Sequence, residues 1–230
     1  MAIELKKLTN EIDHRNDQFT SAVKNQLSDL SKFSDIALEW LMMEHYQFSS
    51  RNTEFLAIAV NTTKQFNEQN ASIELQRNFN EEKNHAAIYK KSLFEIGTDV
   101  DKRIEFSPTT HFFDSILKLI TTSPSCALGA MYATETAAIF EHEVFRDISH
   151  EIIMRRELKW EKSRLKAFHD MHLNGVEQGH KDGLGMFVDL AYDNNDRQLI
   201  QKDQVILGAN QAIHAMVIWW KALCHQAENM

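Results

Sequence analysis

The chain has 230 residues, of which 43% are hydrophobic and 25% are charged, and its formal net charge is −8. This composition is that of an ordinary globular protein and excludes a chain that is disordered for lack of apolar residues. No stretch concentrates Lys and Arg as a phosphate-binding face requires, so we expect no nucleic-acid partner. Because no linker or low-complexity tract divides the sequence, we expect one domain over residues 1–230.

Cysteine content and hydropathy indicate the compartment. The two cysteines, Cys126 and Cys224, are a number typical of a reducing compartment. The first residues, "MAIELKKLTNEIDHRNDQF", lack the apolar core of a signal peptide, and no window of about 18 apolar residues occurs. We therefore expect a cytoplasmic protein with no membrane partner.

Proline and glycine are scarce, with two and seven in the chain, so few positions force a turn and we predict an all-α fold. After a mostly polar N-terminal stretch, the first predicted helix runs from near Ser34 to residue 66, with a bend or break around Ser49–Asn52. The second starts near Ala71 and ends before Gly97. Its inward-facing stripe, with members four and three residues apart, is Leu75, Phe79, Glu82, Ala86, Tyr89, Leu93 and Ile96.

The second half of the chain continues as helices joined by short loops. Residues 98–108 form a predicted connector, and "TTSPS" separates the two helices that follow it. The remaining predicted helices, with "DNND" as the loop before the last, are Thr110–Thr121, Ser125–His150, Glu157–Tyr192 and Gln201–Gln226.

Glu82 interrupts the apolar stripe of the second helix, and a buried carboxylate is costly unless a cation or a hydrogen-bond partner satisfies it. His85 follows three residues later, which places both side chains on one helix face. Glu-x-x-His is the pair that di-iron carboxylate bundles place on a helix. For this motif alone, a solvated Glu beside a surface His is the commoner explanation.

A second acid, Glu135, lies in another inward stripe, whose members are Leu128, Tyr132, Glu135, Ile139 and His142. Glu141 and Glu143 flank His142 and fall partly outside the stripe, so they are lesser candidates. The alternative for Glu135 is a core acid satisfied by an Arg or a Tyr.

The third element is "FHDMHLNGVEQGH" at residues 168–180. His172 and His180 are two helical turns apart, and Glu177 with His180 forms a second Glu-x-x-His. Clustered His and Glu suit iron, manganese or zinc. The alternative, a polar solvent face, leaves Gly175 and Gly179 unexplained, because a glycine inside a helix costs up to ~1 kcal/mol relative to alanine.

The three elements together supply three carboxylates and three imidazoles, which is an inventory for two metal ions. Three Glu anions with two divalent cations would leave one net positive charge, and six side chains leave open positions for O2 or substrate. The set contains no cysteine, which argues against a structural zinc site.

In this order the elements resemble the haem-oxygenase-like di-iron oxidases and oxygenases, in the branch named for a chlamydial protein associating with death domains. The matching pieces span roughly Ser34 to Leu190 and are "EHYQFSSRNTEFLAIA", "LQRNFNEEKNHAAIY" followed by "EIG", "LGAMYATE" and "FHDMH…EQGH". The resemblance implies a haem-oxygenase-like bundle of about seven helices. It places the metal ligands at Glu82, His85, Glu135, His172, Glu177 and His180.

Two departures from the family pattern leave alternatives open. The usual interval between the first Glu and His is seven residues, although three also occurs, so Glu81 is an alternative to Glu82. The usual His-x-x-x-Asp-x-x-His has one extra residue between His172 and Glu177. We expect a π-bulge to absorb that residue; in a regular helix the two side chains diverge and His169 could replace one of them.

The resemblance further implies an enzyme that binds two Fe(II) ions and uses O2 to oxidise a small amino acid or amine. The outcomes in the family are N-oxygenation, desaturation and C–C cleavage, and the formation of an indole nitrile from a tryptophan derivative is a specific possibility. We assign a catalytic role to Glu177, which would shift as O2 enters. We also expect a homodimer and an external reductant.

Two rival functions come from other classes. A metal-independent enzyme of the TenA or PqqC type would use Cys126 as its nucleophile, and a non-catalytic interaction protein would need no metal. Glu44 and His45 could be groups near the site or a helix-face pair. Five large side chains could line an aromatic-accepting pocket or belong to the plain core: Phe79, Tyr132, Met171, Trp219 and Trp220.

Overall fold

The computed structural model describes residues 7–64, 70–191 and 200–230, and within these ranges it contains helices and no strand. None of the helices described there has both the length and the hydropathy that crossing a membrane requires. The α-helices are α1 Leu8–Gln26, α2 Asp35–Thr63, α3 Asn70–Glu82, α4 His85–Glu95, α5 Ser107–Thr122, α6 Pro124–Arg155, α7 Arg164–Met171, α8 Glu177–Leu190 and α9 Lys202–Glu228.

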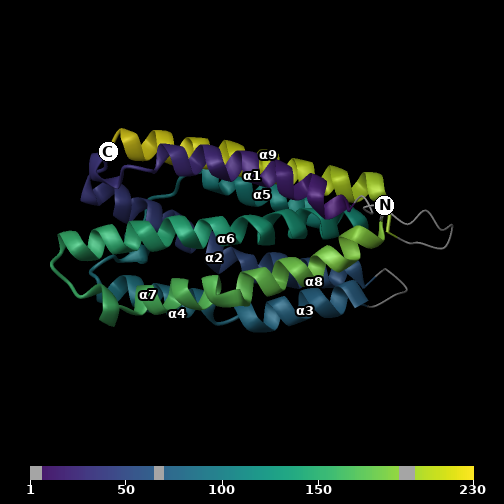
Figure 1. Ribbon diagram of the computed structural model, residues 1–230, viewed down its shortest axis with the longest axis horizontal. Coiled ribbons are helices and arrows are strands. Elements are labelled where there is room, and N and C mark those ends of the chain that lie inside the picture. The colour runs from purple at the N-terminus through teal and green to yellow at the C-terminus, as the bar shows by residue number, and fades with distance from the viewer. Residues whose placement is uncertain (1–6, 65–69, 192–199) are drawn as a thin grey trace, which may run out of the picture.

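Two pairs of these helices, α3 with α4 and α7 with α8, follow each other end to end, so the nine α-helices of the described residues form seven helical segments. Only residues 83–84 separate α3 from α4, and a π-helical turn, His172–Val176, joins α7 to α8 without a gap. These segments lie roughly along the long axis of the molecule (Figure 1). The predicted all-α bundle of about seven helices is confirmed.

Helix α6 is the centre of the bundle and packs against α1, α2, α5, α7, α8 and α9. In Figure 1, α1 and α9 lie on one side of it, and α3, α4, α7 and α8 lie on the other. Gly129 of α6 and Gly208 of α9 allow a close approach, because a Cβ on either would collide with a backbone oxygen of the facing helix. The helix that carries Glu135 is therefore fixed from all sides.

The predicted polar N-terminal stretch is in fact the helix α1, which buries four apolar side chains along one narrow face: Leu8, Ile12, Phe19 and Val23. The predicted break at Ser49–Asn52 is absent, because α2 continues through it. The hydroxyl of Ser50 donates back to the carbonyl of Gln47 within the same helix, at 2.9 Å, so its polar group is satisfied without ending the helix. Residues 65 and 66 lie outside the described residues.

The second predicted helix, from Ala71 to Ile96, is two helices, with a break at residues 83–84. Residues 83 and 84 form the turn between the two helices, and Asn84, at φ −108° and ψ −7°, precedes the first residue of α4. The predicted stop at Gly97 is confirmed: its φ is +91°, and the amide of Thr98 donates to the carbonyl of Leu93 at 3.0 Å.

The predicted helix from Glu157 starts too early. Helix α6 runs on to Arg155, and Glu157 has a φ of +56°, which interrupts the helix. A short 3₁₀ turn, Trp160–Lys162, follows, and α7 begins at Arg164, where the hydroxyl of Ser163 accepts from the amide of Leu165. Tyr192 and the "DNND" loop lie outside the described residues.

Candidate metal centre

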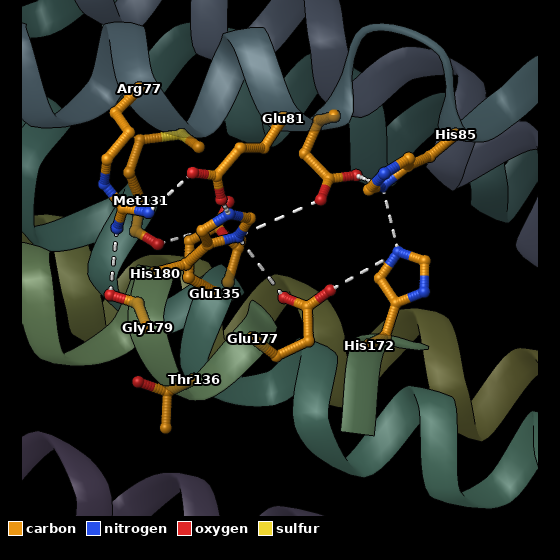
Figure 2. Close-up of polar contacts among 12 residues, drawn as sticks. Arg77, Glu81, His85, Met131, Glu135, Thr136, His172, Glu177, Gly179 and His180 are labelled. Atoms are coloured by element: carbon orange, nitrogen blue, oxygen red, sulfur yellow. Dashed lines mark hydrogen bonds and ion pairs between the residues drawn. The ribbon is translucent and has the colours of Figure 1, made fainter. Parts of the chain in front are cut away.

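The structure brings the six predicted metal ligands together. Glu82 ends α3, His85 begins α4, Glu135 lies on α6, His172 lies in the π turn, and Glu177 and His180 lie in the first turn of α8. All six are buried, with at most 9% of any residue exposed. Figure 2 shows five of them, His85, Glu135, His172, Glu177 and His180, converging from facing helices. The explanations that place these side chains in solvent are therefore wrong.

One half of the cluster contains two imidazoles. Nδ1 of His85 lies 2.9 Å from Oε2 of Glu82 and 3.0 Å from Nε2 of His172. Oε1 of Glu177 is 3.8 Å from Nε2 of His172.

His180 forms the other half. Its Nδ1 lies 3.1 Å from Oε2 of Glu135, 3.6 Å from Oε2 of Glu177 and 3.9 Å from Oε1 of Glu82. Glu82 and Glu177 therefore each direct one carboxylate oxygen toward each half. This is the arrangement that bridging carboxylates need.

A π turn at His172–Val176 takes up the extra residue as predicted, but it is also a kink between α7 and α8, because Asn174 and Gly175 leave helical geometry. Gly175 takes a φ of +118°, a conformation that favours glycine, whereas Gly179 lies in the regular helix α8 and has no such requirement. The extra residue is absorbed, and the regular-helix alternative with His169 as a replacement ligand is wrong. Both ring nitrogens of His169 face other partners, His142 at 3.1 Å and Ser149 at 3.3 Å.

The electrostatics of the cluster reflect its burial. Burial raises the pKa of Glu135, against the opposing effect of the His180 hydrogen bond. Burial alone would lower the pKa of His180, but its bonds to Glu135 and Glu177 raise it to about 11. Burial also lowers the pKa of His172 to about 3, and its neighbour His142 adds to that shift. The carboxylates around His180, which include Glu81 at 2.9 Å from Nε2, thus favour the protonated form of this imidazole when no metal ion is bound.

Two observations show that the residues fit metal ions. Oε1 of Glu82 is buried with no hydrogen-bond partner among the described residues, and no Lys or Arg there contacts Glu82, Glu135 or Glu177. Nδ1 of His172 lies 2.8 Å from the carbonyl of Phe168, which can only accept, so Nδ1 carries the proton and Nε2 presents a lone pair to the cluster. Three trios of buried donor atoms lie within 4.8 Å of one another: Glu82, His85, His172; His142, His172, Glu177; and Glu82, Glu177, His180.

Glu81 lies at the outer edge of the cluster. Its Oε2 is 2.9 Å from Nε2 of His180, but its side chain is 41% exposed. Arg77 donates to Oε1 of Glu81 at 2.9 Å and to the carbonyl of Gly179 at 3.1 Å, as Figure 2 shows. Arg77 and Glu81 also line a cavity of about 580 Å³ between α2 and α3. The cluster thus meets the surface on this side.

Sequence reasoning did not assign His142 to the site. Its Nε2 lies 3.4 Å from Oε1 of Glu177, and its ring stacks on His172 with centroids 3.8 Å apart. The signal was present, because His142 belongs to the same inward stripe as Glu135.

The acids beside His142 have different environments. Glu141 is buried and accepts from the indole of Trp220 at 3.2 Å. Burial and the nearby charges of Glu177 and Glu135 raise its pKa to about 8, with the Trp220 hydrogen bond opposing them. Glu143 pairs with Lys24 near the surface and takes no part in the cluster.

Glu44 and His45, which are adjacent on α2, have different roles. Glu44 accepts from Arg103 at 2.6 and 2.9 Å and from Thr109, so it belongs to a buried ion pair. His45 packs beside the cluster, with Nδ1 3.1 Å from the hydroxyl of Tyr89 and its ring stacked on Phe145.

The plain-core alternative holds for three of the five candidates for an aromatic-accepting pocket. Tyr132, Trp219 and Trp220 are at most 1% exposed and belong to the core, while Met171 is 37% exposed. The cavity beside Glu81 is lined by none of the five. Cys126 is fully buried and its burial raises the thiol pKa, which is the opposite of what a nucleophile requires.

The chain matches no protein-family model and no curated protein. It is similar in structure to a CADD-like protein of unknown function from Nostoc punctiforme, with a TM-score of 0.76, 21% identity and coverage of 94% of this chain and 98% of that one. It is also similar to a domain of unknown function with a haem-oxygenase-like fold from Shewanella denitrificans, with a TM-score of 0.69, 14% identity and coverage of 98% of this chain and 94% of that one. A third similar structure is a TenA homologue from Pseudomonas syringae, with a TM-score of 0.67, 15% identity and coverage of 94% of this chain and 90% of that one. The chain therefore has a haem-oxygenase-like fold.

Proposed function

We propose that the chain is an O2-dependent oxidase or oxygenase that holds two Fe(II) ions at this centre and acts on a small amino-acid-like metabolite. The observation that carries the proposal is the position of Glu82 and Glu177, each of which directs one oxygen toward the imidazoles of one half and the other toward the second half. Buried carboxylates with this arrangement, and with no Lys or Arg partner in the part of the chain that the structure describes, suit a pair of divalent cations.

Within this proposal, His85 and His172 hold one position, Glu135 and His180 hold the other, and Glu82 and Glu177 face both. The iron pair, when bound, supplies electrons for the reduction of O2. The chain's own contribution is to bury these side chains, which keeps water out, and to orient His172 through the carbonyl of Phe168. Glu177 is the residue best placed to change its partners, because both of its oxygens face imidazoles from different helices.

The cavity beside the cluster supports an amino-acid-like substrate. Its lining combines Lys64 with the apolar side chains Val60 and Ile73, which together could receive a carboxylate and an organic side chain. Arg77 also lines the cavity but is paired with Glu74 and Glu81. Formation of an indole nitrile from a tryptophan derivative rests on the family resemblance alone. The homodimer and the external reductant stay predictions.

The test is anaerobic loading with Fe(II), removal of free metal, and measurement of iron per chain, followed by an optical scan and O2-uptake measurement with a panel of amino acids. We expect two irons per chain and an absorption change on adding O2. Fewer than one iron per chain, or no O2 uptake with any member of the panel, would count against the proposal.

A further inference from the structure

His142 occupies a place in the cluster that the six-ligand set does not explain. It lies seven residues after Glu135 on α6, two helical turns along the same face, and is 7% exposed. Its Nε2 is 3.4 Å from Oε1 of Glu177. Its ring stacks on that of His172 at an interplanar angle of 12°, so one of the two rings must turn for both lone pairs to reach the same ion. Nε2 of His142, a ring nitrogen of His172 and a carboxylate oxygen of Glu177 thus surround one position, since the three residues offer donor atoms within 4.8 Å of one another.

We infer that His142 is a seventh metal-binding residue, which completes with His172 and Glu177 one of the two metal positions. This inference rests on the proposed function. His142 and His85 belong to different trios that share His172: His142 joins it with Glu177, and His85 joins it with Glu82. The position near Glu135 receives the imidazole of His180 among carboxylates.

The hydrogen bonds behind His142 support this role. Its Nδ1 lies 3.1 Å from Nδ1 of His169, whose Nε2 lies 3.3 Å from the hydroxyl of Ser149. The Ser149 hydroxyl donates to the sulfur of Met42 at 3.6 Å. When the single proton of the Ser149 hydroxyl is donated to Met42, the Ser149 oxygen can only accept from His169, so the proton of His169 is on Nε2. Nδ1 of His169 is then an acceptor, and it receives the proton that Nδ1 of His142 donates.

In that order of donors, Nε2 of His142 carries no proton and points at a carboxylate oxygen. Two lone pairs facing each other in a buried site require a cation between them. The direction of these hydrogen bonds can also reverse, so that Ser149 donates to His169, His169 donates to His142 and His142 donates to Glu177. This reversed direction gives every polar group of the chain a partner in the metal-free protein. A histidine whose other ring nitrogen is held by such a partner is the usual form of a metal ligand.

The experiment compares metal binding by the wild type and by His142→Ala. Both proteins are titrated anaerobically with Co(II), and metal per chain and ligand-field absorption are recorded, which requires no turnover. We expect two ions per wild-type chain, and in the variant one ion bound with a second whose affinity has fallen at least about tenfold. His142→Gln, which keeps more of the side-chain volume, should show the same loss if His142→Ala does not fold.

Two controls identify the cause. Free imidazole should restore the second ion in His142→Ala, because the truncated side chain leaves room for it. His45→Ala removes another buried imidazole whose Nδ1 faces Tyr89, and it should keep both ions. Equal loss in His45→Ala would show general loosening of the bundle and would overturn the inference.

The inference and the proposed function fail in different ways. If the wild type binds two ions and a folded His142 variant also binds two with unchanged affinity, His142 is not a ligand and the two-metal function stands. If the wild type itself does not bind two ions, the proposed function fails.

Discussion

Nδ1 of His85 lies 2.9 Å from Oε2 of Glu82, although the two residues belong to different helices. Helix α3 ends at Glu82, and the break at residues 83–84 sets the direction in which α4 begins. Glu82 is turned inward, at 7% exposure, while Glu81 points to the edge and pairs with Arg77. The geometry thus favours Glu82 as the ligand.

Removing the charge of Glu82 should therefore affect metal binding more than removing that of Glu81. We expect Glu82→Gln to lose at least one of the two irons, because its two oxygens face both halves of the cluster. Glu81→Gln should keep both irons. Iron per chain after anaerobic loading measures the difference, and equal losses in the two variants would contradict it.

Gly175 and Gly179 form a matched pair for testing the π turn. A Cβ on either would meet nothing within 4 Å, so the two positions differ in backbone conformation and not in space. Gly175→Ala should destabilise the metal-free protein by about 1–3 kcal/mol, because φ is +118° there. Gly179→Ala should stabilise it by up to about 1 kcal/mol, since the position is helical. Urea unfolding measures both, and a shift of the same sign in the two variants would contradict the assignment.

Glu141 should make the stability of the metal-free protein depend on pH. Its pKa is raised from 4.5 to about 8 in the folded state, so between these values the folded chain holds a proton that the unfolded chain releases. Stability therefore falls as pH rises through this window, by up to about 1.4 kcal/mol per pH unit for this group.

Glu141→Gln keeps an acceptor for Trp220 and removes the titration. The free energy of unfolding, measured by urea denaturation across the window, should fall less steeply with pH in the variant than in the wild type. His180, whose pKa is also raised, titrates in both proteins, so the difference between them isolates Glu141. Parallel pH profiles would show that Glu141 is ionised in the folded protein.

The rival functions predict opposite outcomes for two sets of variants. His172→Ala and His180→Ala should abolish iron binding and O2 uptake, whereas a non-catalytic interaction protein would tolerate both changes. Cys126→Ala should keep O2 uptake with any active substrate, because the thiol is buried and its pKa is raised. Thiol-dependent hydrolysis that Cys126→Ala removes would instead favour the metal-independent class.

Helical periodicity was sufficient to predict the main helices, because α2, α5, α6 and α9 carry inward residues at regular spacing. Helix α1 was missed because its buried face carries few apolar side chains: Leu8, Ile12, Phe19 and Val23, with the polar Asn16 in the position between the middle two. The break after Glu82 was missed because the apolar stripe continues across it from Phe79 to Ala86. Neither feature contains a proline or glycine to mark it.

Convergence of the six candidate ligands could be predicted because each lies on an inward stripe or in a matching motif. The outward turn of Glu81 could not, since it depends on where α3 ends. The proximity of His142 to Glu177 could not either, because it is a contact between two helices whose relative rotation no single helix pattern determines. The role of Glu44 depended on Arg103, which is 59 residues away in the sequence.

The π turn between His172 and Glu177 also changes how related sequences can be recognised. The wide, kinked turn takes up the extra residue between α7 and α8, so an interval of five residues here can perform the spatial task of an interval of four elsewhere. A search for this kind of site should therefore allow either interval, and a glycine within the longer one marks where the additional residue is accommodated.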